Sequence, residues 1–315
     1  MRKLRIVCLF VMTGVFFSAQ AQEKSSIVRL DPGLDNILAS DAKVEKLAGD
    51  LGMTEGPVWD RKGGYLLYSD RASETISKWD PRDGKVSVFL DKSYSNGITI
   101  DRQGQVVFTV RGEYRQIQRM EKDGRRTVLV SEFEGKRLNS PNDLVYKSDG
   151  SLYFSDPIQA GIPGQELSYN GLFRIKDGKI QLLVKDQPRP NGLAFSPDEK
   201  YLYVCDTGDR DKKLIYRYEV QRDGTLADRT LFTDYMGDKG QGTCDGMKVD
   251  ERGNVHTGGP GGIWIFSPGG KHLGTVLTPQ APINMAFGDP DGKALYVGAR
   301  SDLYRIRFKV SGIRP

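Results

Sequence analysis

At 315 residues the chain is long enough for one large domain or two small ones, so length alone leaves the number of domains open. Its 37 glycines and 15 prolines, beside 38% hydrophobic residues, are typical of a globular protein with many tight turns. Three of the 46 basic residues lie in the first 21 positions, which leaves 43 basic against 41 acidic residues. This near-neutral balance, without a Lys/Arg run, argues against a nucleic-acid partner.

The N-terminus has the pattern of a secretory signal peptide over residues 1–21. Three basic residues at positions 2 to 5 precede an apolar run that ends at Phe17, and Ser18-Ala-Gln-Ala21 supplies small residues for cleavage. The run is too short to cross a bilayer, so we expect no membrane anchor. We therefore expect residues 22–315 to form one mature domain in the periplasm or outside the cell.

An internal repeat runs through the rest of the chain. Six segments begin with an oxygen-bearing side chain, continue into a strand-like run and recur at intervals of 39 to 54 residues. We call their first residues the anchors: Glu55, Asn96, Asn142, Asn191, Asp245 and Asn284. Such an interval suits one blade of a β-propeller or one unit of a solenoid.

Each unit has the pattern of antiparallel strands. In five units a glycine stands eight residues after the anchor, as Gly63 does, and we expect it to supply the positive φ of a hairpin turn; the fourth unit has Glu199 there. Larger apolar residues alternate before this position, for example Leu193 and Phe195, and a second apolar run follows. Most units then add two more strands around a polar turn. Four antiparallel strands define a blade, so we predict an all-β, six-bladed β-propeller.

The sixth unit ends with its third strand, over Leu303–Phe308, close to the C-terminus. A missing fourth strand would leave an unpaired edge, which proteins generally avoid. The segment Val44–Ala48 precedes the first anchor and can form a strand. We predict that it completes the sixth blade and closes the ring.

The anchors are expected to meet in a central channel, because the first strand of each blade lies nearest the axis. Polar groups crowded there must be hydrogen-bonded, hydrated or metal-bound, since burying them bare costs roughly 1 to 3 kcal/mol each. Glu55 and Asp245 supply negative charge and Asn142 and Asn191 neutral oxygens, which favours Ca²⁺, with Mg²⁺, Mn²⁺ or Zn²⁺ as alternatives. A hydrated polar plug, or anchors that merely begin turns, would be the structural alternatives.

Other chemistries find little support in the sequence. His256 lies in a strand pattern and is expected to be packed or hydrogen-bonded, while His272 is expected in a turn, and their spacing does not suit a metal site or a catalytic triad. The glycine-rich run Gly258–Gly262 precedes a strand rather than a helix, which argues against a phosphate loop. Cys205 and Cys244 could form a disulfide in an exported protein, but we favour two buried free thiols.

Four segments carry a resemblance to a known family: Glu55-Gly-Pro-Val-Trp59, Arg137-Leu-Asn-Ser-Pro-Asn-Asp143, Pro190-Asn-Gly-Leu-Ala-Phe-Ser-Pro-Asp198 and Asp245-Gly-Met-Lys-Val-Asp250. With them the chain resembles the SMP-30/gluconolactonase family and the broader calcium propellers that include regucalcin and diisopropyl fluorophosphatase. The resemblance implies a six-bladed fold and a divalent ion at the positions of Glu55, Asn142, Asn191 and Asp245. It also implies that Asp245 is the general base or nucleophile.

The resemblance leads us to expect hydrolysis of a sugar-derived lactone, with the ion polarising the carbonyl and Asp245 activating water. Asn96, Arg111, Asn139 and Asp143 are candidates to hold substrate hydroxyls, with ordinary loop structure as the alternative. The chain departs from many bacterial members at Arg111, where they have His, and at Cys244, where they have Pro.

Two other functions stay open at this point, because a fold does not by itself give an activity. One is a non-catalytic propeller that binds a metal or a sugar. The other is a hydrolase of a phosphoester or a different sugar derivative. In each case we expect a small-molecule partner and a monomer or weak dimer.

Overall fold

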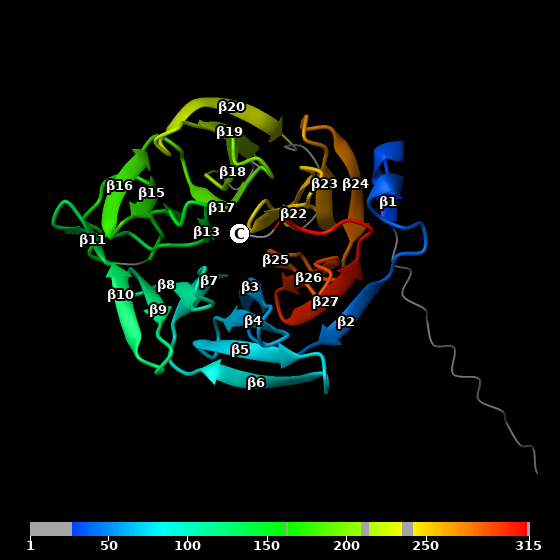
Figure 1. The fold of residues 1–315 in the computed structure, drawn as a ribbon, viewed down its shortest axis with the longest axis horizontal. Coiled ribbons are helices and arrows are strands. Elements are labelled where there is room, and N and C mark those ends of the chain that lie inside the picture. The colour runs from blue at the N-terminus through cyan, green and yellow to red at the C-terminus, as the bar shows by residue number, and fades with distance from the viewer. Residues whose placement is uncertain (1–26, 162, 209–213, 235–241, 314–315) are drawn as a thin grey trace, which may run out of the picture.

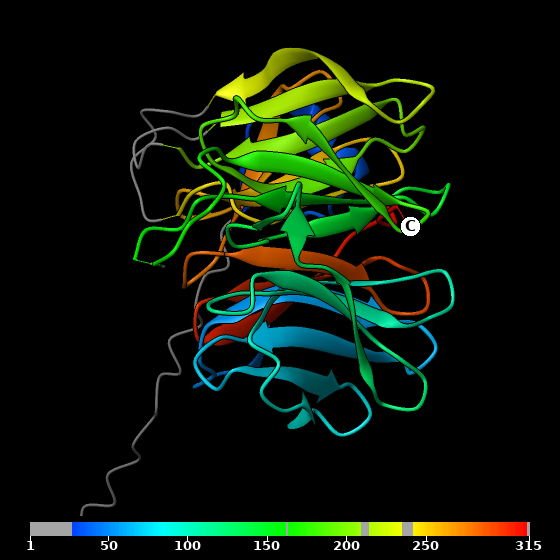
Figure 2. The same ribbon diagram turned by 90° about the vertical axis from the view of Figure 1, so that its left-hand side faces the viewer.

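The structure is a computed structural model that describes residues 27–161, 163–208, 214–234 and 242–313. Six sheets are arranged around a central axis (Figure 1), and seen from the side their strands run between two faces of the ring (Figure 2). The predicted six-bladed, all-β propeller is therefore confirmed. The predicted signal peptide lies outside the described residues. The described residues include no helix with the length and apolar character needed to cross a membrane.

Each blade is an antiparallel sheet whose first strand in sequence lies innermost, apart from the added strands discussed below. The first three blades comprise β3 (Thr54–Asp60), β4 (Tyr65–Asp70), β5 (Thr75–Asp80) and β6 (Lys85–Leu90); β7 (Ser95–Ile100), β8 (Val106–Val110), β9 (Gln116–Met120) and β10 (Arg126–Val130); and β13 (Leu144–Tyr146), β14 (Leu152–Asp156), β15 (Gly171–Lys176) and β16 (Lys179–Val184). The last three comprise β17 (Pro190–Phe195), β18 (Tyr201–Asp206), β19 (Leu214–Val220) and β20 (Leu226–Asp234); β21 (Met247–Val249), β22 (Val255–Gly259), β23 (Gly262–Phe266) and β24 (His272–Leu277); and β25 (Asn284–Gly288), β26 (Ala294–Ala299) and β27 (Asp302–Arg307).

The ring closes as predicted. β2 (Val44–Ala48) pairs with β27, with Val44 opposite Ile306, and so becomes the outer strand of the sixth blade. First and last blades also pack through their side chains, since Trp59 stacks on Tyr296 with ring centroids 5.2 Å apart. One chain segment thus joins the two ends of the repeat and covers the edge of β27 that the sixth unit would otherwise leave unpaired.

The fifth blade has its four predicted strands and one more. A further strand, β1 (Ile27–Arg29), pairs with β24 and gives this sheet five strands. The 3₁₀ helix η1 (Pro32–Asn36) follows, capped by Asp31, whose side chain accepts a hydrogen bond from the Gly33 N–H. A three-residue strand has too few positions to show an alternating pattern, which is why the sequence did not indicate it.

Three smaller features differ from what the sequence led us to expect. His272 begins β24 rather than lying in a turn, and its ring stacks on Trp264. In the first unit the positive φ falls on Gly64 rather than Gly63. A short hairpin of β11 (Glu132–Phe133) and β12 (Lys136–Arg137) stands before the third blade and was not expected.

The apolar core is divided among the six interfaces between neighbouring blades, each of which contains one cluster of buried side chains. Burying a large apolar side chain stabilises a fold by roughly 1.5 to 3 kcal/mol. The clusters lie between blades, and some of their members, such as Ile98 and Leu193, also reach the central channel. Cys205 and Cys244 are buried at the interface of the fourth and fifth blades and are not joined by a disulfide, in line with the favoured expectation.

Candidate active site

The anchors lie where they were predicted, at or just before the start of the innermost strands. The labels of β3, β7, β13, β17 and β25 surround the axis in Figure 1. Glu55, Asn96, Asn191 and Asn284 lie within innermost strands, whereas Asn142 and Asp245 precede β13 and β21 by two residues. Six positions that are distant in sequence are therefore brought to one end of the channel.

The glycine after an anchor allows neighbouring blades to approach closely. A Cβ at Gly192 would collide with the backbone carbonyl of Asp245, and one at Gly56 with that of Asn96. The Gly192 N–H instead donates a hydrogen bond to that Asp245 carbonyl, at 3.1 Å. The Asn-Gly and Asp-Gly pairs of the repeat are thus required by contact around the ring, not only by turn formation.

The innermost strands also carry irregularities beside the anchors. The pairing register shifts between Glu55 and Val58, between Ser95 and Ile98, and between Pro190 and Leu193. Bulges of this kind change the direction of a side chain and are common next to active sites. Here they coincide with the anchor and its glycine in the first, second and fourth blades.

The third unit has an acid where its neighbours have glycine. Asp143 follows the anchor Asn142, and its Oδ2 accepts a hydrogen bond from the Asn284 amide at 3.3 Å, while its Oδ1 accepts the Leu144 N–H at 2.9 Å. Asn284 belongs to the sixth blade, so this bond crosses the channel. The anchor end of the channel is consequently narrow.

Three carboxyl groups, those of Glu55, Asp143 and Asp245, share this space. Burial, opposed by the charge of Arg71 and helped by that of Asp143, raises the pKa of Glu55 to about 7. Burial, followed by the charge of Glu55, raises the pKa of Asp245 well above its ordinary value. Arg71 lies 3.9 Å from Glu55. A dry group of acids with incomplete compensation is the environment that a bound cation stabilises.

Two of the predicted metal ligands also have side-chain oxygens that accept no hydrogen bond. Asn191 Oδ1 and Asp245 Oδ1 are buried and have no hydrogen-bond partner, although leaving such atoms bare costs free energy. Asn142, Asn191 and Asp245 keep part of their surface open to the channel, while Glu55 is 3% exposed. The four side chains fit a hard divalent cation by chemistry. No group of three or more His, Cys, Asp and Glu side chains in the described ranges has the arrangement of a metal site, so the amide oxygens are essential to this reading.

The residues predicted to bind substrate lie in different environments. Asn96 donates its amide to Asn142 Oδ1 at 3.1 Å, and therefore orients a predicted ligand. Arg111 donates to the Arg71 carbonyl at 2.8 Å, and its Nε has no partner. Asn139 is fully buried and donates to the carbonyl of Tyr169 at 2.9 Å, as a residue that orders a loop would.

His256 is a packed residue, as expected. Its Nε2 lies 3.0 Å from Asp250 Oδ2, both side chains are fully buried, and its ring meets the edges or faces of Phe287 and Phe308. These contacts occupy the ring on several sides. It takes no part in the channel site.

Three residues near the acids were missed as functional candidates. Arg71 follows β4 and gave no signal in the sequence, whereas Asn284 was recognised as an anchor without a role. Lys248 belongs to one of the family-like segments, and its own position two residues beyond an anchor-Gly pair was the available signal. Burial lowers the pKa of Lys248, and the charge of Asp143 acts to raise it.

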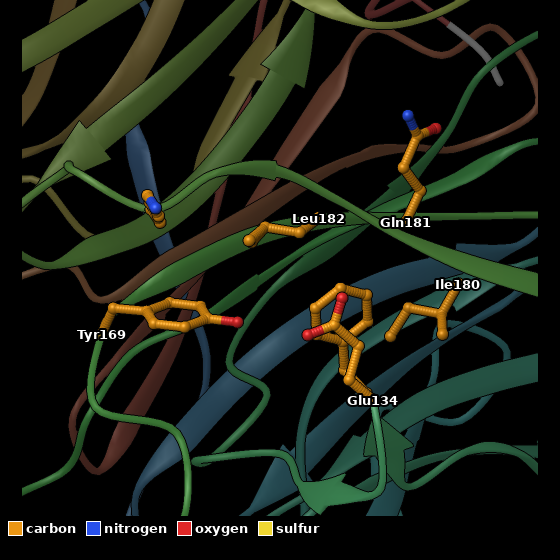
Figure 3. A pocket seen from close by; sticks show the side chains of 7 residues that line it. Glu134, Tyr169, Ile180, Gln181 and Leu182 are labelled. Carbon is orange, nitrogen blue, oxygen red and sulfur yellow. The ribbon is translucent and has the colours of Figure 1, made fainter.

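A separate hollow of about 510 Å³ lies away from the anchors, beside the β11–β12 hairpin and β16. Tyr169 and Glu134 turn their polar ends toward the same space, next to Ile180 and Leu182 (Figure 3). No anchor lines this hollow. It is therefore not the place where the three acids act.

The fold and site define a class: a six-bladed propeller whose channel presents carboxylate and amide oxygens at one end. The model of the SMP-30/Gluconolactonase/LRE-like region matches residues 53–301. The chain belongs to this family, which confirms the resemblance noted in the sequence.

Named relatives agree with this assignment. The chain is 37% identical to a gluconolactonase of Zymomonas mobilis, over 91% of this chain and 87% of that protein. It is 27% identical to pentonolactonase XacC of Haloferax volcanii, over 77% of this chain and 80% of that protein. Among solved structures, a gluconolactonase from Xanthomonas campestris superposes with a TM-score of 0.81 and 32% identity, over 90% and 94% of the two chains.

Proposed function

We propose that this protein hydrolyses a sugar-derived lactone with the help of a divalent cation in the channel. The observation that carries the proposal is the convergence of Glu55, Asn142, Asn191 and Asp245, with two buried oxygens that lack partners. Membership of a family with gluconolactonase and pentonolactonase relatives supports the reaction. The relatives' names differ in the length of the sugar acid, so the proposed substrate class is the aldonolactones.

The four proposed ligands would hold Ca²⁺ in preference to a softer metal, because all are oxygen donors and two are uncharged. When bound, the ion supplies a Lewis acid for the lactone carbonyl and the charge that develops on its oxygen. Asn96 fixes the Asn142 carboxamide by its hydrogen bond, so that Oδ1 stays on the channel side. The ring of blades provides rigid positions for the ligands, which favours preorganisation.

Asp245 is proposed to accept the proton of the attacking water. Its buried carboxylate is more basic than an exposed one, since burial and Glu55 raise its pKa, and its Oδ1 has no other hydrogen bond. The Asp245 backbone is held by the Gly192 N–H, which fixes the position of the carboxylate. Water adds to the carbonyl carbon as Asp245 takes its proton, the ring C–O bond then breaks, and the proton passes from Asp245 to the leaving oxygen to give the ring-opened hydroxy acid.

Arg111 and Arg71 are proposed to bind the polar periphery of the substrate. Both guanidinium groups lie near Glu55 and have a buried Nε without a partner. Such donors suit ring hydroxyls or the carboxylate of the product. Asp143 is proposed to act in the same region through its contact with Asn284.

A panel of five- and six-carbon aldonolactones tests the proposal. Acid release is followed in a pH-stat with saturating Ca²⁺, with excess EDTA, and with buffer alone to subtract spontaneous opening. We expect calcium-dependent acid release from at least one lactone. Release from none of them in the presence of calcium would contradict the proposal and favour a binding propeller.

We also propose that the protein is exported and that its first 21 residues are removed. The basic start, apolar run and small-residue end of this segment support the proposal. Mass determination of the protein from a periplasmic fraction and from the medium tests it. We further propose a monomer or weak dimer, which sedimentation velocity at two concentrations distinguishes from a stable oligomer.

A further inference from the structure

We propose that the other half of the channel is a binding site for a small organic anion with an apolar body. A cavity of about 390 Å³ occupies this half, within the size range of small-molecule sites. It is lined by residues from the later part of all six innermost strands and by Ile313, but by none of the anchors. It is therefore distinct from the proposed lactone site.

The walls of the cavity are largely apolar. Side chains of this kind come from several blades: Val58, Ile98, Leu144, Leu193 and Phe287. Ile313 contributes from the C-terminal segment, where its N–H donates to the Val249 carbonyl at 2.9 Å. Such walls attract aliphatic or aromatic groups and give little to a sugar, whose hydroxyls would lose hydrogen bonds to water.

Lys248 is the cationic group on the wall. Its side chain is partly open to the cavity, and its ammonium donates one described hydrogen bond, to the Met247 carbonyl at 2.9 Å. An ammonium has three N–H donors, so an anion in the cavity can accept from it. Asp143, on the anchor side, is the other charge that acts on it. The cation lies between the two halves and can interact with either.

The mouth of the cavity carries charges of both signs. The acids there are already bound: Asp60 accepts the Gly63 N–H, Asp101 accepts two backbone N–H groups, and Glu199 pairs with Lys147. Lys62 and Arg102 are exposed at the mouth, and neither has an ion pair within the described part of the chain. Asp60, Asp101 and Glu199 stand against Arg61, Lys62 and Arg102 in the lining, so the charges at the mouth balance and Lys248 gives the cavity its preference for an anion.

The experiment compares two fluorescent probes on the full mature chain with calcium present. The anion 8-anilinonaphthalene-1-sulfonate has the same ring system as N-phenyl-1-naphthylamine, which lacks its charge. We expect the sulfonate to bind with one site per chain and at least tenfold more tightly than the neutral probe. Binding at many weak sites, or equal affinity for the two probes, would overturn the proposal.

Substitutions locate the site. Lys248→Met is expected to lower the affinity for the sulfonate about tenfold and to leave the neutral probe unaffected, whereas Lys85→Met, at an exposed outer strand, is expected to change neither. Ile98→Phe, which fills the cavity, is expected to weaken both probes. Unchanged sulfonate binding in Lys248→Met or in Ile98→Phe would place the probe elsewhere and refute the site.

A competition on the unmodified protein keeps the inference testable if these variants do not fold. Octanoate is expected to displace the sulfonate at concentrations at least tenfold lower than octanol, because only octanoate carries the charge. Equal displacement by both, or by neither, would count against the proposal. Neither outcome bears on lactone hydrolysis, which is measured separately.

Discussion

The two halves of the channel are built by the same six strands but differ in chemistry. At the anchor half, carboxylates and carboxamides face one another, with Asn96 bonded to Asn142 and Asp143 to Asn284. In the far half, apolar side chains such as Ile98 and Leu193 line a cavity with Lys248 on its wall. The lining of the channel changes from polar to apolar over two or three residues of a strand. In three blades a register shift separates the halves. A short irregularity at each strand start is thus enough to give one ring two kinds of surface.

Asp245→Asn should have the largest effect on the anchor half. We expect kcat for lactone hydrolysis to fall roughly 10³-fold, within the range for loss of a general base, because a carboxamide cannot accept the proton. Asn has nearly the same shape, so the melting temperature should not fall. Initial rates of acid release, with Asp83→Asn in an exposed turn as the matched control, measure the effect.

Calcium affinity separates the two roles of Asp245. Isothermal titration of the same variant shows whether binding is lost together with turnover. A variant that hydrolyses lactone at the unmodified rate would remove Asp245 from the mechanism. In the far half, the affinity for the fluorescent sulfonate should be the same in Asp245→Asn and in the unmodified protein.

Gly192→Ala tests whether contact around the ring positions the anchors. An added Cβ would meet the Asp245 carbonyl, a backbone atom that cannot turn away, so we expect a loss of about 3 kcal/mol in the free energy of unfolding. Hydrolysis should fall as well, because Asp245 must shift. Urea denaturation measures the loss.

Gly269→Ala is the matched control, since the nearest atom to its Cβ would be Ser267 Oγ at 3.8 Å. We expect this variant to unfold within about 0.5 kcal/mol of the parent, as surface substitutions usually do. If both glycine variants were equally stable, the close approach of blades at the anchors would not be a constraint. The comparison of the two halves would then lose its structural basis.

Glu55→Gln should weaken Ca²⁺ binding about 100-fold, which is about 2.7 kcal/mol, by removing one of two proposed charged ligands. Without calcium the variant should be more stable than the parent, because Glu55 and Asp245 no longer repel each other. Titration calorimetry and thermal melts with and without EDTA measure these effects. Glu45→Gln, on the exposed edge strand β2, is the control. Equal calcium affinity in parent and Glu55→Gln would exclude Glu55 as a ligand.

The blades and the anchor half could be predicted from sequence because the repeat encodes them. A recurring polar residue at the start of a strand has one location in a propeller, so Glu55 and Asp245 could be placed together although 190 positions separate them. Ring closure by Val44–Ala48 followed from the need to cover an edge, and the pairing of β2 with β27 confirms it. These arguments depend on the period of the repeat, which can be read from a single sequence.

The other features of the structure depend on contacts between residues that do not recur along the sequence. Arg71 approaches Glu55 because it follows β4, which pairs with β3, and the strand β1 is defined by its partner β24 rather than by its own three residues. Lys248 was visible in the sequence, but its place between the acids and an apolar cavity follows from the convergence of all six blades. Local patterns do not specify such neighbours.

Asp156 is a buried acid outside both halves of the channel. Its substitution should have the smallest effect, a change in the pH dependence of stability. It is fully buried, its carboxylate accepts the N–H groups of Asn139 and Ser140, and burial raises its pKa to about 7 from an ordinary 3.8. The folded state therefore holds the proton more tightly than the unfolded chain, and its contribution to stability is lost as pH rises through 7. Between pH 6 and 8 this amounts to about 1.4 kcal/mol.

Asp156→Asn should remove this part of the pH dependence. Urea denaturation at pH 6 and pH 8, in saturating calcium so that the anchor acids are compensated in both proteins, measures the difference. Asp149→Asn, an exposed acid in the turn after β13, serves as the control and should retain the slope of the parent. If Asp156→Asn also retained it, the buried carboxylate would be ionised throughout, stabilised by its two backbone N–H groups. Hydrogen bonds alone would then suffice to keep a dry acid charged in this fold, and the raised pKa of the anchor acids would no longer argue for a cation.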